Sequence, residues 1–262
     1  MKKKHLVDVI FASDKRKRVL LMLKDEPQEM KNLLKELDTN RPALLPQMRI
    51  LKDHSLIYHS GDVYGLTTIG KIVVDEMKPF LDTIETLCKH NHYLSTHNTD
   101  SIPKEFLKRI SSIKGSHIIE PNIVNTHEMN SDYLKVALAS KAVYFVFTFM
   151  HPACPSILKQ LADKNINVEI IFTRGLVDKL LEGWSDEFRH FIAYDNIKFY
   201  LHEQKVGISS LTVTDAGFLL RLLFNNGDFS NKQMLCLSPQ GRQWGKELYD
   251  YYLKNAKPIT HV

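Results

Sequence analysis

Two positions in the chain carry side chains that could hold a small anion. Thr148 and His151 follow one apolar stretch, and Thr173 and Arg174 follow the next. If a helix follows each stretch, its free N–H groups and positive dipole end favour negative charge beside the hydroxyl, imidazole and guanidinium. These four residues are the predicted ligand-binding site for a small carboxylate or phosphate compound. The alternative is that Arg174 pairs with a nearby carboxylate and His151 caps a helix, because structural ion pairs give the same pattern.

Histidines and cysteines form no recognised metal motif. His90, His92 and His97 have a mixed spacing that fits no common zinc pattern, and we interpret them as solvated linker side chains. His151 and Cys154 would supply only two ligands, fewer than a structural zinc site uses. The three cysteines lie far apart without a CxxC pair, which argues against a disulfide framework. No metal and no cofactor are expected.

The elements around the predicted ligand site alternate between strand and helix from about residue 102 onward. Near-continuous apolar strands such as 143–149 are typical of a sheet covered on both faces. Later strands follow one another through short turns, which favours antiparallel pairing there. The expected strands are 116–120, 143–149, 168–173, 198–201, 209–214, 218–224 and 234–237, and the expected helices are 129–140, 156–164, two within 176–193 and one from Pro239. We therefore predict an α/β domain with a mixed, mostly parallel sheet.

The N-terminal third has a different pattern. Apolar residues at helical spacing over 30–37 precede the turn-forming residues 38–40, a second helix and a hairpin around Gly61. This order predicts an α+β winged helix-turn-helix, a fold that docks in a DNA groove. Pro46 leaves two readings open: the second helix begins at Pro42, or it begins near Leu45 after an irregular lead-in that brings Arg41 to the phosphates.

Charge is consistent with a DNA-binding domain. Residues 1–80 hold 15 Lys or Arg against 11 Asp or Glu, which is +4 of the chain's formal net charge of +5. Basic side chains on such a surface displace counterions from the phosphate backbone. The expected partner is double-stranded DNA, and the alternative is a helical bundle whose hairpin binds another protein. The predicted DNA-binding residues are Arg16, Lys17, Asn40, Arg41, Ala43, Leu45, Gln47, Arg49, His59 and Tyr64.

A long apolar stripe follows the hairpin, from Ile72 to Leu87. A stripe without a core of its own packs against another domain or a second copy, and we expect a homodimer. The predicted domains are a DNA-binding domain over 1–75, a linker and dimerisation helix over 76–100, and an effector-sensing domain over 101–262. The longest apolar run, residues 142–150, is far shorter than the roughly 20 residues of a membrane span. We expect a cytoplasmic protein without membrane contact.

Five segments carry a specific likeness: Leu44 to Met48, Leu66 to Lys71, Lys78 to Thr83, Phe149 to Pro152 and Trp244 to Tyr249. Together they resemble the archaeal methanogenesis-regulator type of transcription factor, which has a winged helix followed by a family-specific middle domain. The resemblance spans nearly the whole chain. It implies sequence-specific DNA binding and transcription regulation in a methane-producing archaeon, with the second domain sensing a ligand or partner.

The second domain also resembles a phospholipase D-like fold, which some archaeal regulators use without catalysis. The enzymes need His-x-Lys followed by an Asp about four residues later, because the His attacks phosphorus and the Lys neutralises phosphate. Here two residues separate His202 from Lys205, and Asp215 comes ten residues after the Lys. We interpret His202 as a surface residue at a strand end, the alternative being a ligand contact, and expect no enzyme activity. Three function classes remain: a transcription regulator, a phospholipase D-like phosphodiesterase and a protein-recruiting adaptor.

Overall fold

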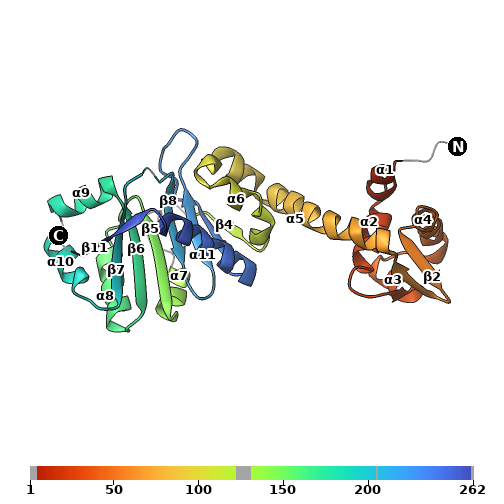
Figure 1. Cartoon of the computed structure of the whole chain (residues 1–262), viewed down its shortest axis with the longest axis horizontal. Coiled ribbons are helices and arrows are strands. Elements are labelled where there is room, and N and C mark those ends of the chain that lie inside the picture. Colours follow the sequence, from red (N-terminus) through yellow and green to blue (C-terminus); the bar gives the residue numbers. More distant parts are fainter. Residues whose placement is uncertain (1–4, 122–130, 184, 205, 261–262) are drawn as a thin grey trace. The chain divides into compact units, whose positions relative to one another are not determined.

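The computed structural model describes residues 5–121, 131–183, 185–204 and 206–260 (Figure 1). The chain divides into two compact units, unit 1 over residues 1–82 and unit 2 over residues 83–262. Helix α5 (Thr68–Thr96) begins in unit 1 and ends in unit 2. The predicted separate linker over 76–100 is therefore mostly one continuous helix.

Unit 1 contains the helices and the hairpin expected from its sequence. Its elements are α1 (Leu6–Phe11), α2 (Asp14–Met22), β1 (Gln28–Glu29), α3 (Met30–Glu36), α4 (Arg41–Asp53), β2 (Ile57–Ser60), β3 (Val63–Leu66) and the first part of α5. The strands form an antiparallel sheet in the order β1-β3-β2. The apolar stripes of the helices meet in one core that includes Leu20, Leu33, Leu44 and Val74. The turn between β2 and β3 contains Gly61 at φ 63°, a conformation that favours glycine.

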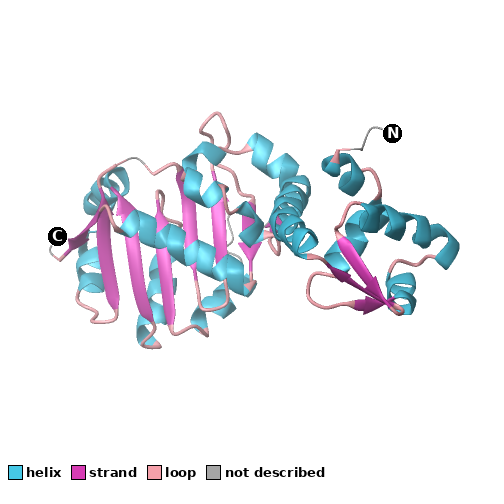
Figure 2. Ribbon diagram, turned by 45° about the vertical axis from the view of Figure 1, so that its right-hand side comes forward, coloured by secondary structure: helices cyan, strands magenta, loops and turns pink. Residues whose placement is uncertain are grey.

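Unit 2 is built on a mixed sheet (Figure 2). Its strands are β4 (His117–Ile119), β5 (Ala142–Phe147), β6 (Asn167–Thr173), β7 (Ile197–His202), β8 (Ile208–Val213), β9 (Phe218–Leu222), β10 (Gln233–Cys236) and β11 (Ala256–Ile259). Its helical elements after α5 are η1 (Thr99–Ser101), α6 (Lys104–Leu107), η2 (Ile110–Ile113), α7 (Ser131–Leu138), α8 (Cys154–Asp163), α9 (Arg174–Gly183), α10 (Ser185–Ile192) and α11 (Pro239–Leu253). The described strands lie in the order β11-β7-β6-β5-β8-β9-β10-β4.

The sheet corrects one prediction. Within the described residues only the pairs β5–β6 and β6–β7 are parallel, and every other neighbouring pair is antiparallel. The sheet is mixed, as predicted, but mostly antiparallel. Residues 214–217 join β8 to β9 and residues 223–232 join β9 to β10, and both connections are shorter than the roughly dozen residues that a parallel crossover needs. Leu211 of β8 and Leu220 of β9 are apolar because they pack in the core under α11.

The two faces of the sheet carry separate cores. Helix α11 covers one face, where Trp244, Leu248 and Tyr249 pack with Phe218 and Leu220 (Figure 2). Helices α8, α9 and α10 cover the other face over β5, β6 and β7. Trp244, Tyr249 and Tyr252 of α11 are thus core residues.

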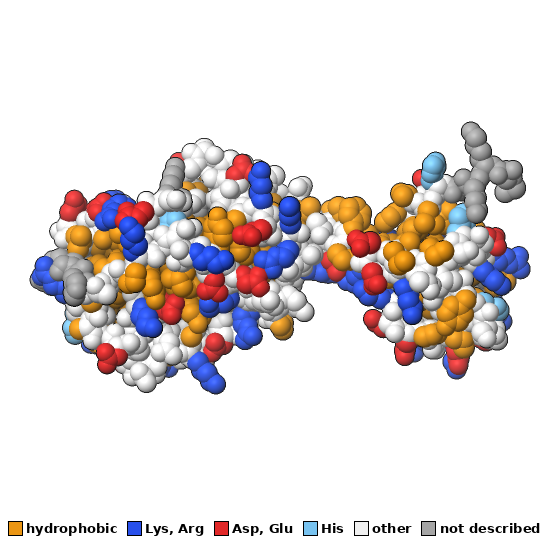
Figure 3. Space-filling model, viewed as in Figure 1, with side chains coloured by type: hydrophobic (Ala, Val, Ile, Leu, Met, Phe, Trp, Pro, Cys, Tyr) orange, Lys and Arg blue, Asp and Glu red, His pale blue; other side chains and the backbone are white. Residues whose placement is uncertain are grey.

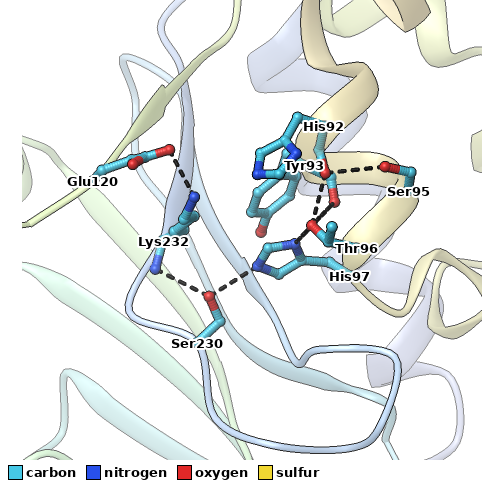
Figure 4. Close-up of polar contacts among 8 residues, drawn as sticks. All are labelled: His92, Tyr93, Ser95, Thr96, His97, Glu120, Ser230 and Lys232. Atoms are coloured by element: carbon cyan, nitrogen blue, oxygen red, sulfur yellow. Dashed lines mark hydrogen bonds and ion pairs between the residues drawn. The ribbon is translucent and has the colours of Figure 1, made fainter.

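Two of the histidines interpreted as solvated linker residues are buried. His97 is 1% exposed, its Nε2 lies 2.8 Å from Ser230 Oγ, and its ring stacks on Tyr93 with centroids 4.0 Å apart (Figure 4). His90 is 2% exposed and hydrogen-bonds to the buried Ser116. The prediction fails because residues 90–96 continue α5 and one side of this helix packs into unit 2. His92 is exposed, as expected.

No helix in the described part of the chain combines the length and the apolar character that a bilayer crossing requires.

Candidate functional site

Helix α4 begins at Arg41, which settles the alternatives left open by Pro46. Asn40 precedes the helix in an extended conformation, and its side-chain Oδ1 accepts a hydrogen bond from Ala43 N at 3.0 Å. Such a cap satisfies one of the N–H groups that a helix start leaves free. Pro42 occupies the first turn, where a missing N–H has no consequence. Pro46 remains inside the helix without the hydrogen bond to Pro42 O.

One face of α4 is buried and the other is open. Leu44, Met48 and Leu51 are at most 2% exposed and face the core of unit 1. Arg49 is exposed, and its side chain makes none of the hydrogen bonds or ion pairs found among the described residues. Pro42, Pro46 and Asp53 are also exposed on this helix. The exposed face of α4 therefore has at its centre a guanidinium that forms no ion pair within the described residues.

Arg16 is placed differently from its prediction as a phosphate contact. Its side chain is 9% exposed, and its Nη1 donates to Gln47 Oε1 at 3.0 Å. The bond ties α2 to α4 and occupies Gln47, which is itself half-buried. Arg16 thus acts as a packing residue under α4, because it lies on the same side of α2 as the core residues Val19 and Leu20.

The other predicted contacts on the helices are only partly open. Lys17 pairs with Asp14 at 2.8 Å. Arg41 pairs with Asp62 in the hairpin turn, also at 2.8 Å, with both side chains more than half exposed. Ala43 and Leu45 are half-buried on α4. Exposed ion pairs of this kind contribute little to stability and exchange readily for other partners.

The hairpin offers His59 rather than Tyr64 to the surface. The two residues are cross-strand partners, and their rings stack with centroids 4.4 Å apart. His59 is exposed, whereas Tyr64 is 6% exposed and belongs to the core. The prediction that Tyr64 is a surface contact is therefore corrected: Tyr64 lies on β3, the central strand of this sheet, and packs in the core of unit 1.

The predicted anion site in unit 2 is occupied by a structural ion pair. Arg174 donates through Nη2 to both carboxylate oxygens of Glu203, each at 3.0 Å. This contact lowers the pKa of Glu203 below its ordinary value. The half-buried Thr173 is the register partner of His202 on the neighbouring strand. The alternative stated for Arg174, a structural ion pair, is the arrangement found.

Thr148 and His151 serve the loop that follows β5. The hydroxyl of Thr148 donates to Ser209 O at 2.9 Å, and His151 Nδ1 accepts from Ala153 N at 3.1 Å. His151 thus caps a local turn just before α8. The loop lies at the carboxyl end of β5, as predicted, and Arg174 begins α9 directly after the neighbouring strand β6.

His202 is buried, which corrects its interpretation as a surface residue. It is 4% exposed, its Nδ1 lies 3.0 Å from Gln204 O, and its ring packs edge-on against Tyr252. His202 ends β7, whereas Asp215 follows β8, which runs in the opposite direction. The two residues therefore lie at opposite ends of the sheet and cannot form the cluster of a phosphodiesterase. Lys205 lies outside the described residues.

Sequence reasoning missed one charged residue of unit 2. Arg221 lies on β9, and its guanidinium carbon is 5.7 Å from the ring centroid of Phe149 and 5.4 Å from that of Phe229. Its Nε is buried and has no hydrogen-bond partner within the described residues, and burial lowers the pKa of the guanidinium. The available signal was a single arginine within the otherwise apolar run 218–224.

Groups of three or more His, Cys, Asp or Glu side chains positioned to hold a metal ion are absent from the described residues.

Both units match known protein families. Residues 126–255 match the family described as the middle domain of the methanogenesis regulatory protein FilR1, and residues 5–88 match the HVO_A0261 N-terminal domain. The methanogenesis regulatory protein FilR1 of Methanothrix harundinacea is 21% identical to this chain over 258 residues, which are 97% of the chain and 58% of that relative. Unit 2 therefore carries a region that matches the FilR1 middle domain, and the chain as a whole is similar to a methanogenesis regulatory protein. This confirms the resemblance inferred from the sequence.

Solved structures align with this chain at low identity and low TM-score. TrmBL2, an archaeal chromatin protein described as showing a novel mode of DNA binding, aligns over 95% of both chains with a TM-score of 0.43 and 10% identity. Nuc of Salmonella typhimurium, a phospholipase D family member, aligns over 56% of this chain and 99% of its own, with a TM-score of 0.39 and 10% identity.

Proposed function

We propose that this chain is a sequence-specific DNA-binding transcription regulator of a methane-producing archaeon. In this proposal unit 1 is a winged helix-turn-helix domain, with α3 and α4 as the helix-turn-helix and the β2–β3 hairpin as the wing. Helix α4 enters the major groove of operator DNA, and the exposed wing residue His59 lies against the backbone. The name of the FilR1 relative supports the regulatory role. A protein with this function works in the cytoplasm.

The observation that carries the proposal is the open face of α4. Arg49 is exposed at its centre without a partner among the described residues, while the opposite face is anchored in the core. A guanidinium in this position can read guanine O6 and N7 or contact phosphate. Asn40 and Arg41 at the start of the helix lie where a recognition helix contacts DNA, and Arg41 can exchange Asp62 for a phosphate.

The test is DNA binding by an Arg49→Ala variant of the full chain. We expect binding to the chain's own upstream DNA to weaken by about 1–3 kcal/mol if Arg49 reads a base, or uniformly across sequences if it contacts phosphate. The matched control is Lys71→Ala, which removes an exposed positive charge of unit 1 outside α4. Unchanged affinity of Arg49→Ala for every duplex, with a normal circular dichroism spectrum, would reject the proposal.

A homodimer is the second part of the proposal. Unit 1 exposes an unusual set of large apolar side chains on α1 and α5, and Figure 3 shows hydrophobic side chains gathered on this unit. The set comprises Leu6, Val7, Phe11, Ile69, Ile72 and Phe80, and the rings of Phe11 and Phe80 meet edge to face. Such patches mark association sites. Two copies would present two reading helices to adjacent half-sites.

The dimer is tested by sedimentation of an Ile72→Asn variant. Ile72 is 62% exposed, so the substitution leaves the core of unit 1 intact while it places an amide in the apolar patch. We expect the variant to be monomeric at concentrations where the wild-type chain and a Lys71→Asn control are dimeric. A monomeric wild-type chain would contradict the proposed homodimer and leave the DNA-binding proposal standing.

Unit 2 is proposed to sense a small ligand or partner and to have no catalytic activity. The sequence predicted Thr148, His151, Thr173 and Arg174 as contacts for a small anion, and these residues lie at the carboxyl ends of β5 and β6. An anion bound there would have to displace Glu203 from Arg174. The separation of His202 from Asp215 supports a non-enzymatic role, and the phosphodiesterase alternative would require turnover that depends on His202.

A further inference from the structure

A row of polar side chains crosses three neighbouring strands of unit 2. Ser210 on β8 is the register partner of Arg221 on β9. On the other side of β9, Met234 is the partner of Leu220, so the preceding residue of β10, Gln233, lies opposite Arg221. Side chains of directly opposed residues share one face of a sheet and have Cβ atoms about 4.5–5.5 Å apart. Ser210, Arg221 and Gln233 therefore stand side by side on one face.

Arg221 is held by aromatic rings and not by a carboxylate. Its guanidinium lies over Phe149 and Phe229, whose rings meet edge to face with centroids 5.2 Å apart. The described residues supply no hydrogen bond or ion pair to its side chain. Ring faces offset part of the cost of removing the charge from water. They leave the N–H groups of the guanidinium, which form a planar fork suited to a carboxylate, without an acceptor.

Neighbouring residues have unsatisfied polar atoms as well. Gln233 is 2% exposed, and its Oε1 has no hydrogen-bond partner among the described residues. Ser209, at the irregularity between Ile208 and Ser210 in β8, is fully buried, and the described part of the chain supplies no partner to its Oγ. Buried polar groups are nearly always hydrogen-bonded, because leaving one unpaired is unfavourable. Three such groups on three adjacent strands indicate a site that is complete only with a ligand.

We propose that this face of β8, β9 and β10 binds a small carboxylate that also carries a hydrogen-bond donor, with Arg221 as the anchor for the carboxylate. Gln233 Oε1 accepts the ligand's hydroxyl or N–H group, and Phe149 and Phe229 flank the charged pair. This inference rests on the proposed sensing role of unit 2. It assigns the contact with the ligand's carboxylate to Arg221 instead of Arg174, which already pairs with Glu203.

The composition of the row favours a carboxylate over a phosphate. One guanidinium supplies one positive charge, which matches a single carboxylate, and its fork pairs with two carboxylate oxygens. A phosphate dianion carries a second negative charge, which one guanidinium does not balance. The loop that carries Phe149 also contains the predicted ligand residues Thr148 and His151, and Thr148 bonds to the backbone of Ser209.

The test is a titration of the full chain followed through the Nε–Hε resonance of Arg221, assigned by its loss in Arg221→Lys. The probes are lactate, propionate, which lacks the hydroxyl, and inorganic phosphate. We expect lactate to shift the resonance, propionate to bind more weakly, and phosphate to bind more weakly still. Affinity for lactate should fall about tenfold or more in Arg221→Lys, because an ammonium cannot replace the bidentate fork.

Two further variants separate the possible results. Phe229→Ala trims a side chain that is 48% exposed, so the fold should persist while lactate binds less tightly. Arg174→Gln should leave lactate binding unchanged. If Arg174→Gln lost lactate binding while Arg221→Lys bound normally, the anchor would be Arg174 at the carboxyl end of β6 and the assignment to Arg221 would be wrong. If none of the three probes bound the wild-type chain, the proposed site would be wrong altogether. If lactate binds but DNA affinity does not change, the site stands and its regulatory coupling fails.

Discussion

Each unit contains an arginine without a polar partner among the described residues, and the two arginines lie in opposite environments. In unit 1, Arg49 stands on an exposed helix face with solvent around it, where a charge needs no partner. In unit 2, Arg221 is enclosed by two aromatic rings, and its Nε is shielded from solvent and unbonded. This difference is the basis of the two proposals, that unit 1 binds DNA through an open surface and that unit 2 binds a small ligand beside buried polar groups.

The largest expected effect concerns the independence of the two units. Trp244 is 1% exposed in unit 2, and its Nε1 donates to Phe106 O at 3.1 Å. Trp244→Ala should lower the free energy of unfolding of unit 2 by about 3–5 kcal/mol, from lost burial and an unfilled cavity. Unfolding in urea followed by circular dichroism should show this transition shifted while that of unit 1 is unchanged.

The matched variant in unit 1 is Leu44→Ala, which should shift only the other transition. If either substitution moved both transitions equally, the units would unfold as one and their functional separation would be wrong.

A smaller effect is expected at the start of helix α4. Asn40→Ala removes the cap that Asn40 Oδ1 provides to Ala43 N and should destabilise unit 1 by about 0.5–2 kcal/mol. DNA binding should weaken with it, because the capped turn positions Arg41. Asn40→Ser serves as the control, since serine caps helices about equally well and adds no negative charge beside the DNA. Equal losses of DNA affinity in both variants would show that the amide acts on DNA and not on the helix.

The pH dependence of stability should also distinguish the units. In unit 2, burial lowers the pKa of His97 and of His90 below the ordinary value of 6.5, with Lys232 and His92 near the first and Lys89 and His117 near the second. As the pH falls, these histidines become protonated in the unfolded chain at a higher pH than in the folded chain. Their contribution to the free energy of unfolding is therefore fully present above pH 6.5 and is lost as the pH falls below that value.

Thermal melts between pH 8 and pH 5 should therefore show that the melting temperature of unit 2 decreases once the pH is below about 6.5. The His97→Gln variant keeps a polar group beside Ser230 and should reduce the slope of melting temperature against pH below this value. If neither this substitution nor His90→Gln changed that slope, other groups would control the loss of stability in acid.

The smallest expected change in stability is at the surface pair of Arg41 and Asp62. Asp62→Ala should alter the free energy of unfolding of unit 1 by no more than about 1 kcal/mol, because both side chains are exposed. Its effect on DNA binding should be opposite in sign to that of Arg49→Ala. Removing the carboxylate frees Arg41 for phosphate, so gel shifts at low salt should show tighter binding. Weaker binding would place the turn of the hairpin in direct contact with DNA.

Local sequence patterns predicted most elements within a few residues. The apolar spacing of Met30, Leu33 and Leu37 predicted α3, and the turn residues around Gly61 predicted the hairpin, because both signals depend on near neighbours in the chain. The short strands β1 and β11 were missed, since each has little apolar pattern of its own. The family resemblance was also readable from the sequence.

The tertiary structure decided which side chains are buried and which lie beside one another. The sequence could not show that Arg16, His97 and His202 are enclosed, because each is enclosed by elements distant in the chain. Strand order and direction depend on competition among all strands for partners, so the mostly antiparallel sheet and the pairing of Arg174 with Glu203 emerged only on folding. The row of Ser210, Arg221 and Gln233 depends on the register of three strands, and no local pattern in the sequence specifies it.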